Sequence, residues 1–146
     1  MKNSPLQLER YYLTSVHLDS DDTLQPKEMP EMQLQSTVGL AEHKEDTRRW
    51  KVLLTVEFKP KDDSIVPYKG SISFTGYFAV APSYPADKVK SLVETNGPSV
   101  LYGAVREMCA NLTARGPWQM LMLPTQSFYN SQAPTKTAEN KADATP

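Results

Sequence analysis

The side chains best able to do chemistry in this sequence are two histidines and one cysteine. Zinc sites require several Cys, His or carboxylate ligands at short spacings. His17 falls in an alternating segment and His43 in a charged loop, and neither has a partner at metal-ligand spacing. Cys109 stands between Val105 and Leu112 at helical spacing, which favours a small buried hydrophobe over a nucleophile. The sequence therefore predicts neither a metal site nor a catalytic thiol.

The carboxylates and glycines form no recognisable catalytic motif. Asp19, Asp21 and Asp22 cluster before a long polar loop. A solvated turn is the first interpretation of this cluster, a partner-facing acidic patch the second and a catalytic pair a distant third. The six glycines of the chain form no nucleophile elbow, phosphate-cradling loop or dinucleotide fingerprint. We therefore expect a protein that is not an enzyme, needs no cofactor and works by binding.

The length, charge and composition of the chain limit the classes of partner that it is expected to bind. The 146 residues fit one domain, with 39% hydrophobic and 23% charged residues. The net charge of −1 gives no electrostatic reason to expect nucleic acid or an anionic membrane surface. No stretch approaches the roughly 20 apolar residues that cross a bilayer, and the N-terminus shows no apolar signal core. Together with the lone cysteine, which fits a reducing compartment, this predicts a cytoplasmic protein without membrane insertion.

Four segments alternate between apolar and polar residues. They cover residues 6–18, 32–40, 50–58 and 66–80, and the even positions carry the apolar side chains. A period of two with one wet face is typical of strands in an antiparallel sheet. The short turn-forming connector after the third segment predicts a hairpin with the fourth. The polar loop 19–31 is long enough for a crossover between the first two strands.

Helical spacing begins after residue 80. Residues 87–94 predict a short helix, and Asn96-Gly97-Pro98 predicts a break, with Asn96 or Ser99 capping a second helix. Gly116 before a proline predicts the end of that helix in a left-handed conformation. An apolar stripe follows the three-to-four spacing of the second helix: Val100, Leu101, Ala104, Val105, Met108, Cys109 and Leu112.

These elements predict an α+β fold. It consists of a four-stranded antiparallel sheet, with a long crossover between strands one and two, packed against a C-terminal helix. Residues 118–128 after the helix are mostly apolar, whereas residues 130–146 contain nothing apolar larger than alanine. Such a tail cannot bury enough surface to offset its ordering entropy. We therefore divide the chain into one domain, residues 1–129, and a disordered polar tail, residues 130–146.

Methionines and aromatic residues flank the crossover loop and follow the helix. Core filling and a polypeptide-binding surface are equally supported for each of them, because flexible thioethers pack well in cores and also adapt to varied partners. The candidate client-binding residues are Met29, Met32, Trp118, Met120, Met122 and Phe128.

One set of motifs runs in a fixed order along residues 6–129. It comprises a first strand of Leu-x-Leu-x-Arg type at residues 6–10, a run from Pro to Ala-x-Arg-Glu within residues 96–107, an Arg-Gly helix end, and a Leu-x-Leu strip before Phe128. In this order the motifs resemble the SecB family of protein-export chaperones. The resemblance agrees with the order of strands and helix predicted above.

The resemblance implies an ATP-independent chaperone, a holdase, that binds non-native polypeptides or preproteins in long hydrophobic grooves. Many weak contacts along one wrapped chain would then add through effective concentration. It also implies a homo-oligomer, a dimer of dimers with helices packed between sheets, and it places Met29 and Met32 of the crossover in the groove. The interface residues implied on the helix are Val100, Leu101, Ala104 and Met108.

Three departures from the family pattern narrow this expectation. Members that deliver clients to the SecA motor present an acidic face on strands one and four. The matching positions here are Ser15, Asp19, Lys69 and Ser71. Because only Asp19 is acidic, holding clients is better supported than docking to SecA. Residues 130–134 do not favour the family's second helix, and Gly103 replaces a helix-kinking proline.

Two functions therefore compete. The first is the holdase, linked to protein export or to one dedicated client. The alternative is a non-enzymatic small-ligand-binding or scaffold domain on a similar sheet-and-helix fold, which would bind a compact ligand and no unfolded chain. An enzyme comes third, since the catalytic constellations are missing from the sequence.

Overall fold

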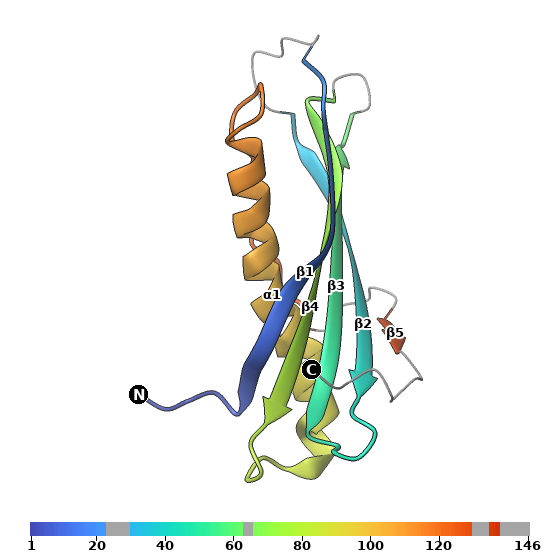
Figure 1. Ribbon diagram of the computed structural model, residues 1–146, viewed down its shortest axis with the longest axis vertical. Helices are drawn as coiled ribbons and strands as arrows, with labels where there is room; N and C mark the ends of the chain where they lie inside the picture. Colours follow the sequence, from blue (N-terminus) through green and yellow to red (C-terminus); the bar gives the residue numbers. More distant parts are fainter. Residues whose placement is uncertain (23–29, 63–65, 130–134, 138–146) are drawn as a thin grey trace.

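The computed structural model describes residues 1–22, 30–62, 66–129 and 135–137. Its strands are β1 (Leu6–Ser20), β2 (Met32–Glu42), β3 (Arg49–Pro60), β4 (Tyr68–Val80) and β5 (Thr135–Thr137), and its helices are η1 (Ala86–Lys88) and α1 (Val89–Thr113). The strands lie in the order β1-β4-β3-β2-β5, and all pair antiparallel except β2 and β5. Figure 1 shows α1 running along one face of the sheet.

This arrangement confirms the predicted fold, a four-stranded antiparallel sheet packed against a C-terminal helix. β1 and β2 lie at opposite sides of these four strands, so the connection between them is the predicted crossover. The short parallel strand β5 was not predicted. It belongs to the predicted polar tail, whose residues 130–134 and 138–146 lie outside the described part of the chain. Among the described residues, no helix is both long and apolar enough to cross a membrane.

The core lies between α1 and the even positions of the sheet. In β3 the even residues Trp50, Val52, Leu54, Val56 and Phe58 are at most 4% exposed, as their alternation predicts. The helix contributes a buried stripe to the same core, formed by Leu101, Tyr102, Val105 and Cys109.

The edge strand β1 departs from the predicted alternation. Its pairing with β4 shifts register within residues 8–10 and again within residues 13–15. A bulge adds one residue to a strand and turns the following side chains to the opposite face. Tyr11 therefore lies beside the core residue Phe74, with ring centroids 6.1 Å apart. The predicted core positions that are wrong for this reason are Arg10, Tyr12 and Thr14.

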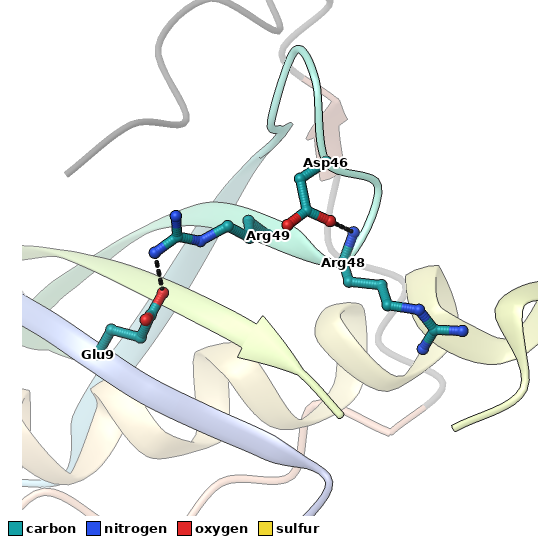
Figure 2. A network of polar contacts seen from close by, with 4 residues as sticks. All are labelled: Glu9, Asp46, Arg48 and Arg49. Atoms are coloured by element: carbon teal, nitrogen blue, oxygen red, sulfur yellow. Dashed lines mark hydrogen bonds and ion pairs between the residues drawn. The ribbon is translucent and has the colours of Figure 1, made fainter. Parts of the chain in front are cut away.

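An ion pair crosses the outer face of the sheet at the first of these shifts. Arg49 Nη2 donates to Glu9 Oε1 at 2.8 Å, and this hydrogen bond raises the pKa of Arg49 (Figure 2). In the turn before β3, the backbone N–H of Arg48 donates to Asp46 Oδ1 at 2.9 Å. The Arg48 guanidinium donates to the carbonyl of Ala81 at 2.7 Å. These contacts connect β1, the β2–β3 turn and the end of β4.

Helix α1 is continuous where the sequence predicts a break. It spans 25 residues with Pro98 in its interior, so residues 87–94 and the second predicted helix are largely one element. Gly97 and Pro98 are buried against the sheet, and a Cβ at Gly97 would lie 3.0 Å from Val52 Cγ2. Close packing of the helix on β3 therefore compensates for the backbone hydrogen bond that proline removes.

Neither predicted cap of the second helix acts as one. Asn96 Nδ2 donates to the carbonyl of Leu92 at 3.1 Å, and Ser99 Oγ donates to the carbonyl of Thr95 at 3.0 Å. Both side chains bond back to the preceding turn, as polar residues inside a helix do. The cap prediction was wrong because it followed from the predicted break.

The end of α1 also differs from the prediction. Gly116 follows the helix, but its φ is not left-handed, and a Cβ there would lie 2.3 Å from Tyr68 Oη. This hydroxyl donates to the carbonyl of Thr113 at 3.2 Å and accepts from the backbone N–H of Trp118 at 3.0 Å. Glycine is thus required for the close approach of the chain to a buried tyrosine, and not for its φ.

Replacing Gly116 with alanine is expected to lower the free energy of unfolding by about 1–3 kcal/mol, because the added methyl group overpacks Tyr68. Gly103→Ala is the matched control, since a Cβ at Gly103 meets nothing within 4 Å. In an open helical position this change should stabilise the protein by roughly 0.5–1 kcal/mol. Urea denaturation followed by circular dichroism measures both. Equal stability of G116A and the wild type would contradict the role given to Tyr68.

Candidate functional site

The segment after α1 forms an extended strip, residues 118–129, on the surface of the core. Within it, buried and exposed side chains alternate. Leu121 and Leu123 are 5% and 1% exposed, whereas Met120 and Met122 are 51% and 58% exposed. The strip is thus attached to the core by its leucines and presents two methionines, followed by the exposed Tyr129.

Three side chains of α1 fix the backbone of this 118–129 strip. Thr113 Oγ1 accepts from the N–H of residue 121 at 2.8 Å, and Arg106 Nε donates to the carbonyl of residue 123 at 3.0 Å. Tyr102 Oη donates to the carbonyl of residue 124. Because buried backbone groups require partners, these bonds explain why an irregular segment can lie on the core.

The strip is also connected to the sheet at both ends. Trp118 Nε1 donates to the carbonyl of Asp21, just after β1, at 2.8 Å. Ser36 Oγ of β2 donates to Gln126 Oε1 at 3.1 Å. The 118–129 strip therefore extends from the end of β1 to β2. It is a supported surface that combines a fixed backbone with flexible exposed thioethers.

The remaining predicted client-binding residues have different environments. Met32 and Trp118 are half-buried and pack against the core. Phe128 is 6% exposed and contacts Tyr102 edge to face, with ring centroids 5.8 Å apart. Phe128 thus fills the core and offers little surface to a partner. Met29 lies outside the described residues.

The residues predicted to form an interface on α1 fall into two groups, one buried in the core and one at least partly exposed. Leu101 is 0% exposed and packs in the core of its own chain, so it is unavailable to a second copy. Val100 is 46% exposed, and Ala104 and Met108 are half-buried beside the core. The true core stripe of the helix includes Tyr102, which the spacing argument omitted.

A second exposed apolar surface lies on β1, and the alternation of the sequence does not predict most of it. Tyr11, Leu13 and Val16 are 52%, 39% and 44% exposed. The two register shifts turn Tyr11 and Leu13 to the side of the sheet that α1 covers elsewhere. Their apolar side chains at odd positions were the available signal, since the alternation predicts polar residues there.

The predicted motor-docking positions gather on the outer face of the sheet. Asp19 pairs with Lys69 in the register of β1 and β4, and Ser15 and Ser71 lie on the same two strands. Asp19 Oδ2 also contacts His17 Nε2 at 3.0 Å. A hollow of about 450 Å³ includes His17, Asp19, Lys69 and Ser71 in its lining. The two carboxylates in its lining, Asp19 and Glu57, are matched by two lysines, Lys59 and Lys69, so the hollow has no net acidic character.

Cys109 is part of the core. It is 1% exposed, and burial raises the pKa of its thiol to about 11. A thiol with so high a pKa is almost entirely protonated at neutral pH, and the thiolate is the reactive form. Among the described residues, no group of three His, Cys, Asp or Glu side chains could hold a metal ion. The arrangement thus gives Cys109 a packing role.

The native protein is accordingly expected to resist thiol reagents at pH 8 and to react with one equivalent after denaturation.

The raised pKa of Cys109 also affects the stability of the protein. Between the unfolded pKa near 9 and the folded pKa of about 11, the unfolded state loses this proton first. Stability should therefore fall as pH rises through that window, by up to about 1.4 kcal/mol per pH unit. Cys109→Ala should lack this loss of stability between pH 9 and about 11. Fast labelling of the native thiol would contradict the packing role given to Cys109.

The chain matches one protein family and is similar in fold to a solved structure. The family model described as preprotein translocase subunit SecB matches residues 1–134. The chain therefore belongs to the SecB family. A similar solved structure is the Mycobacterium tuberculosis Rv1957 SecB-like chaperone in complex with a ChAD peptide from the Rv1956 HigA1 antitoxin. It is 15% identical with a TM-score of 0.67, and the match covers 84% of this chain and 91% of that chain.

A second solved structure, a protein of unknown function from Streptococcus agalactiae, is less similar in fold. It is 17% identical with a TM-score of 0.43, and the match covers 82% of this chain and 96% of that chain. The sequence matches no curated protein. The family match supports a chaperone role, and the likeness to Rv1957 shows a similar fold.

Proposed function

We propose that the protein is an ATP-independent holdase that binds non-native polypeptides or preproteins, either for export or for one dedicated client. The observation that carries this proposal is the 118–129 strip. Its backbone is fixed by α1, while Met120 and Met122 are about half exposed. Flexible methionines on a fixed support suit clients of varied sequence. The peptide in the Rv1957 complex supports the same kind of ligand for this chain.

The direct test is binding of a permanently unfolded polypeptide, such as reduced and carboxymethylated lactalbumin, followed by fluorescence anisotropy. We expect saturable binding of the unfolded form, no binding of the same protein in its native form, and no effect of added ATP. Binding of neither form would contradict the proposal. Equal binding of both forms would also contradict it, because a holdase must distinguish non-native from folded chains.

The same proposal includes a homo-oligomer, a dimer of dimers. Two exposed apolar surfaces support it, one on β1 (Tyr11, Leu13 and Val16) and one on α1 around Val100. Light scattering coupled to size exclusion should report a mass above that of one chain. Val16→Glu should reduce that mass, whereas Lys51→Glu, on the outer face of the sheet, should leave it unchanged. A monomeric wild type at micromolar concentration would contradict this part.

Docking to the SecA motor is the less supported interaction. The outer face combines Asp19 with Lys69, so it lacks the acidic character that the resemblance implies for SecA docking. We therefore propose that the protein holds clients independently of SecA. Lys69→Glu should increase any measured affinity for SecA if the outer face is the docking surface.

The second candidate function, binding of a small ligand, has one observation in its favour. The outer-face hollow of about 450 Å³ lies within the usual size range of ligand sites. The residues that line it are mostly of polar or charged types, with Gln33, Gln35, Glu57 and Lys59 beside the β1 and β4 residues, whereas hydrophobic and aromatic side chains predominate in ligand sites. A compact ligand that binds saturably, together with no binding of unfolded chains, would favour this candidate.

A further inference from the structure

The edge strand β2 lacks the features that usually protect an exposed sheet edge. It is 11 residues long and pairs with β3 without a register shift, from Met32 opposite Pro60 to Glu42 opposite Trp50. It contains no lysine, arginine or proline, and its one charged residue is the terminal Glu42. Natural proteins block sheet edges with charges, prolines, bulges or short strands, because an open edge accepts further strands.

The other edge strand is different. β1 is interrupted by two register shifts and carries the charged residues Glu9, Arg10 and Asp19 along its length. Bulges and charges of this kind oppose pairing with another strand. The contrast within one sheet indicates that the regular edge of β2, charged only at Glu42, is a feature of this one edge and not a property of both edges.

The structure itself places an extended segment on the β2 edge. β5 pairs in parallel with Val38, Gly39 and Leu40, through residues 135–137, and lies on the side of β2 away from β3 (Figure 1). No other strand of the described residues contacts this edge, so 32–37 of β2 have no strand partner on that side.

The composition of the tail indicates what this edge recognises. Residues 130–146 contain nothing apolar larger than alanine, so the sequence of β5 offers no large apolar side chain for a pocket. Strand addition obtains its affinity from main-chain hydrogen bonds, which any extended chain without proline can form. The edge also adjoins the 118–129 strip, because Ser36 of β2 bonds to Gln126.

We propose that the β2 edge binds an extended stretch of a non-native client by strand addition, and that β5 is an internal competitor for the same positions. This inference rests on the proposed holdase function and adds a main-chain site next to the Gln126 end of the 118–129 strip. A client strand along β2 displaces β5 from residues 38–40 and continues over residues 32–37. Sequence tolerance follows, since main-chain pairing does not depend on the client's side chains.

The test uses two variants and the unfolded carboxymethylated lactalbumin probe. Deleting residues 130–146 removes the competitor and is expected to lower the dissociation constant about two- to tenfold, according to how fully β5 occupies the edge. Gly39→Cys with Lys136→Cys joins two residues that lie opposite each other in the β2–β5 register. The oxidised pair fixes β5 on the edge and should weaken probe binding about threefold or more. Reduction should restore it, and the single Gly39→Cys variant is the control for the substitution.

Hydrogen exchange on the unmodified protein gives an independent readout. Backbone amides of residues 32–40 should become protected when the probe binds, and those of residues 38–40 should exchange faster once the tail is deleted. Unchanged exchange in β2 upon probe binding would overturn the proposal even if the cysteine variants do not fold. Unchanged affinity in both the truncated and the oxidised forms would also overturn it, while the holdase function would stand. If the probe binds to no form, the holdase function itself fails.

Discussion

Replacing Met120 and Met122 together with glutamine is expected to weaken the binding of unfolded polypeptides about tenfold to 30-fold. Full burial of one methionine side chain contributes about 1.5–3 kcal/mol. Both side chains are already about half covered in the free protein, at 51% and 58% exposure. The two together should therefore contribute about 2 kcal/mol, which corresponds to a roughly 30-fold change in the dissociation constant. Fluorescence anisotropy with an unfolded polypeptide measures the change.

The stability of this double variant should be close to that of the wild type. Exposed side chains that make no specific contact change the free energy of unfolding by roughly 0.5 kcal/mol or less. The matched control is Gln119→Ala with Thr125→Ala, which alters exposed polar positions of the same strip and should leave client affinity unchanged. If the methionine variant bound clients as tightly as the wild type, the strip would not be the client-binding surface.

Leu123→Ala should produce the largest loss of stability among changes to the strip, about 2–5 kcal/mol. Leu123 is 1% exposed and belongs to the core cluster, so truncation removes buried methyl groups and leaves a cavity. The carbonyl of the same residue accepts from Arg106 Nε. Loosening of the side chain should therefore also loosen the strip and weaken client binding at temperatures where the protein remains folded.

Met122→Ala is the control for Leu123→Ala, since it truncates the neighbouring side chain on the exposed side. It should reduce client affinity with little change in stability. Leu123→Ala thus tests how the strip is attached to the core, and Met122→Ala tests the side chain that it exposes to clients. Urea denaturation measures the stability of each variant, and anisotropy measures its client affinity. Similar losses of stability for both variants would contradict the assignment of Leu123 to the buried side of the strip and of Met122 to the exposed side.

The sequence predicted the positions of β2, β3 and β4 well because each is regular. The predicted wet face holds for β3 but is wrong for the middle of β4, where the odd residues Ser73, Thr75 and Tyr77 are buried as well as the even ones. In β3 the apolar residues from Trp50 to Phe58 all point into the core. β1 shows where such an argument ends. No glycine or turn residue marks the bulges of β1 in the sequence. Strict alternation therefore places the even residues Arg10 and Tyr12 in the core, whereas the register shifts turn them to the outer face. Register depends on the partner strand, which alternation alone does not specify.

The helix and the strip show two further limits. Gly97 and Pro98 are strong local breakers, and a tertiary contact with Val52 overrides them. The composition of the strip predicts a candidate client-binding surface, which stays a prediction, but the apolar residues 120–123 are consecutive. Without alternation in residue type, the sequence does not distinguish the buried Leu121 from the exposed Met122. That distinction comes from the bonds that α1 makes to the strip.

The most direct test of the holdase function is aggregation of a denatured protein diluted into buffer, followed by light scattering. The chaperone at equimolar or moderate excess should suppress the scattering in proportion to its concentration and without ATP, and M120Q/M122Q should suppress it much less. Scattering that is unchanged by an excess of the folded wild-type protein would contradict the account.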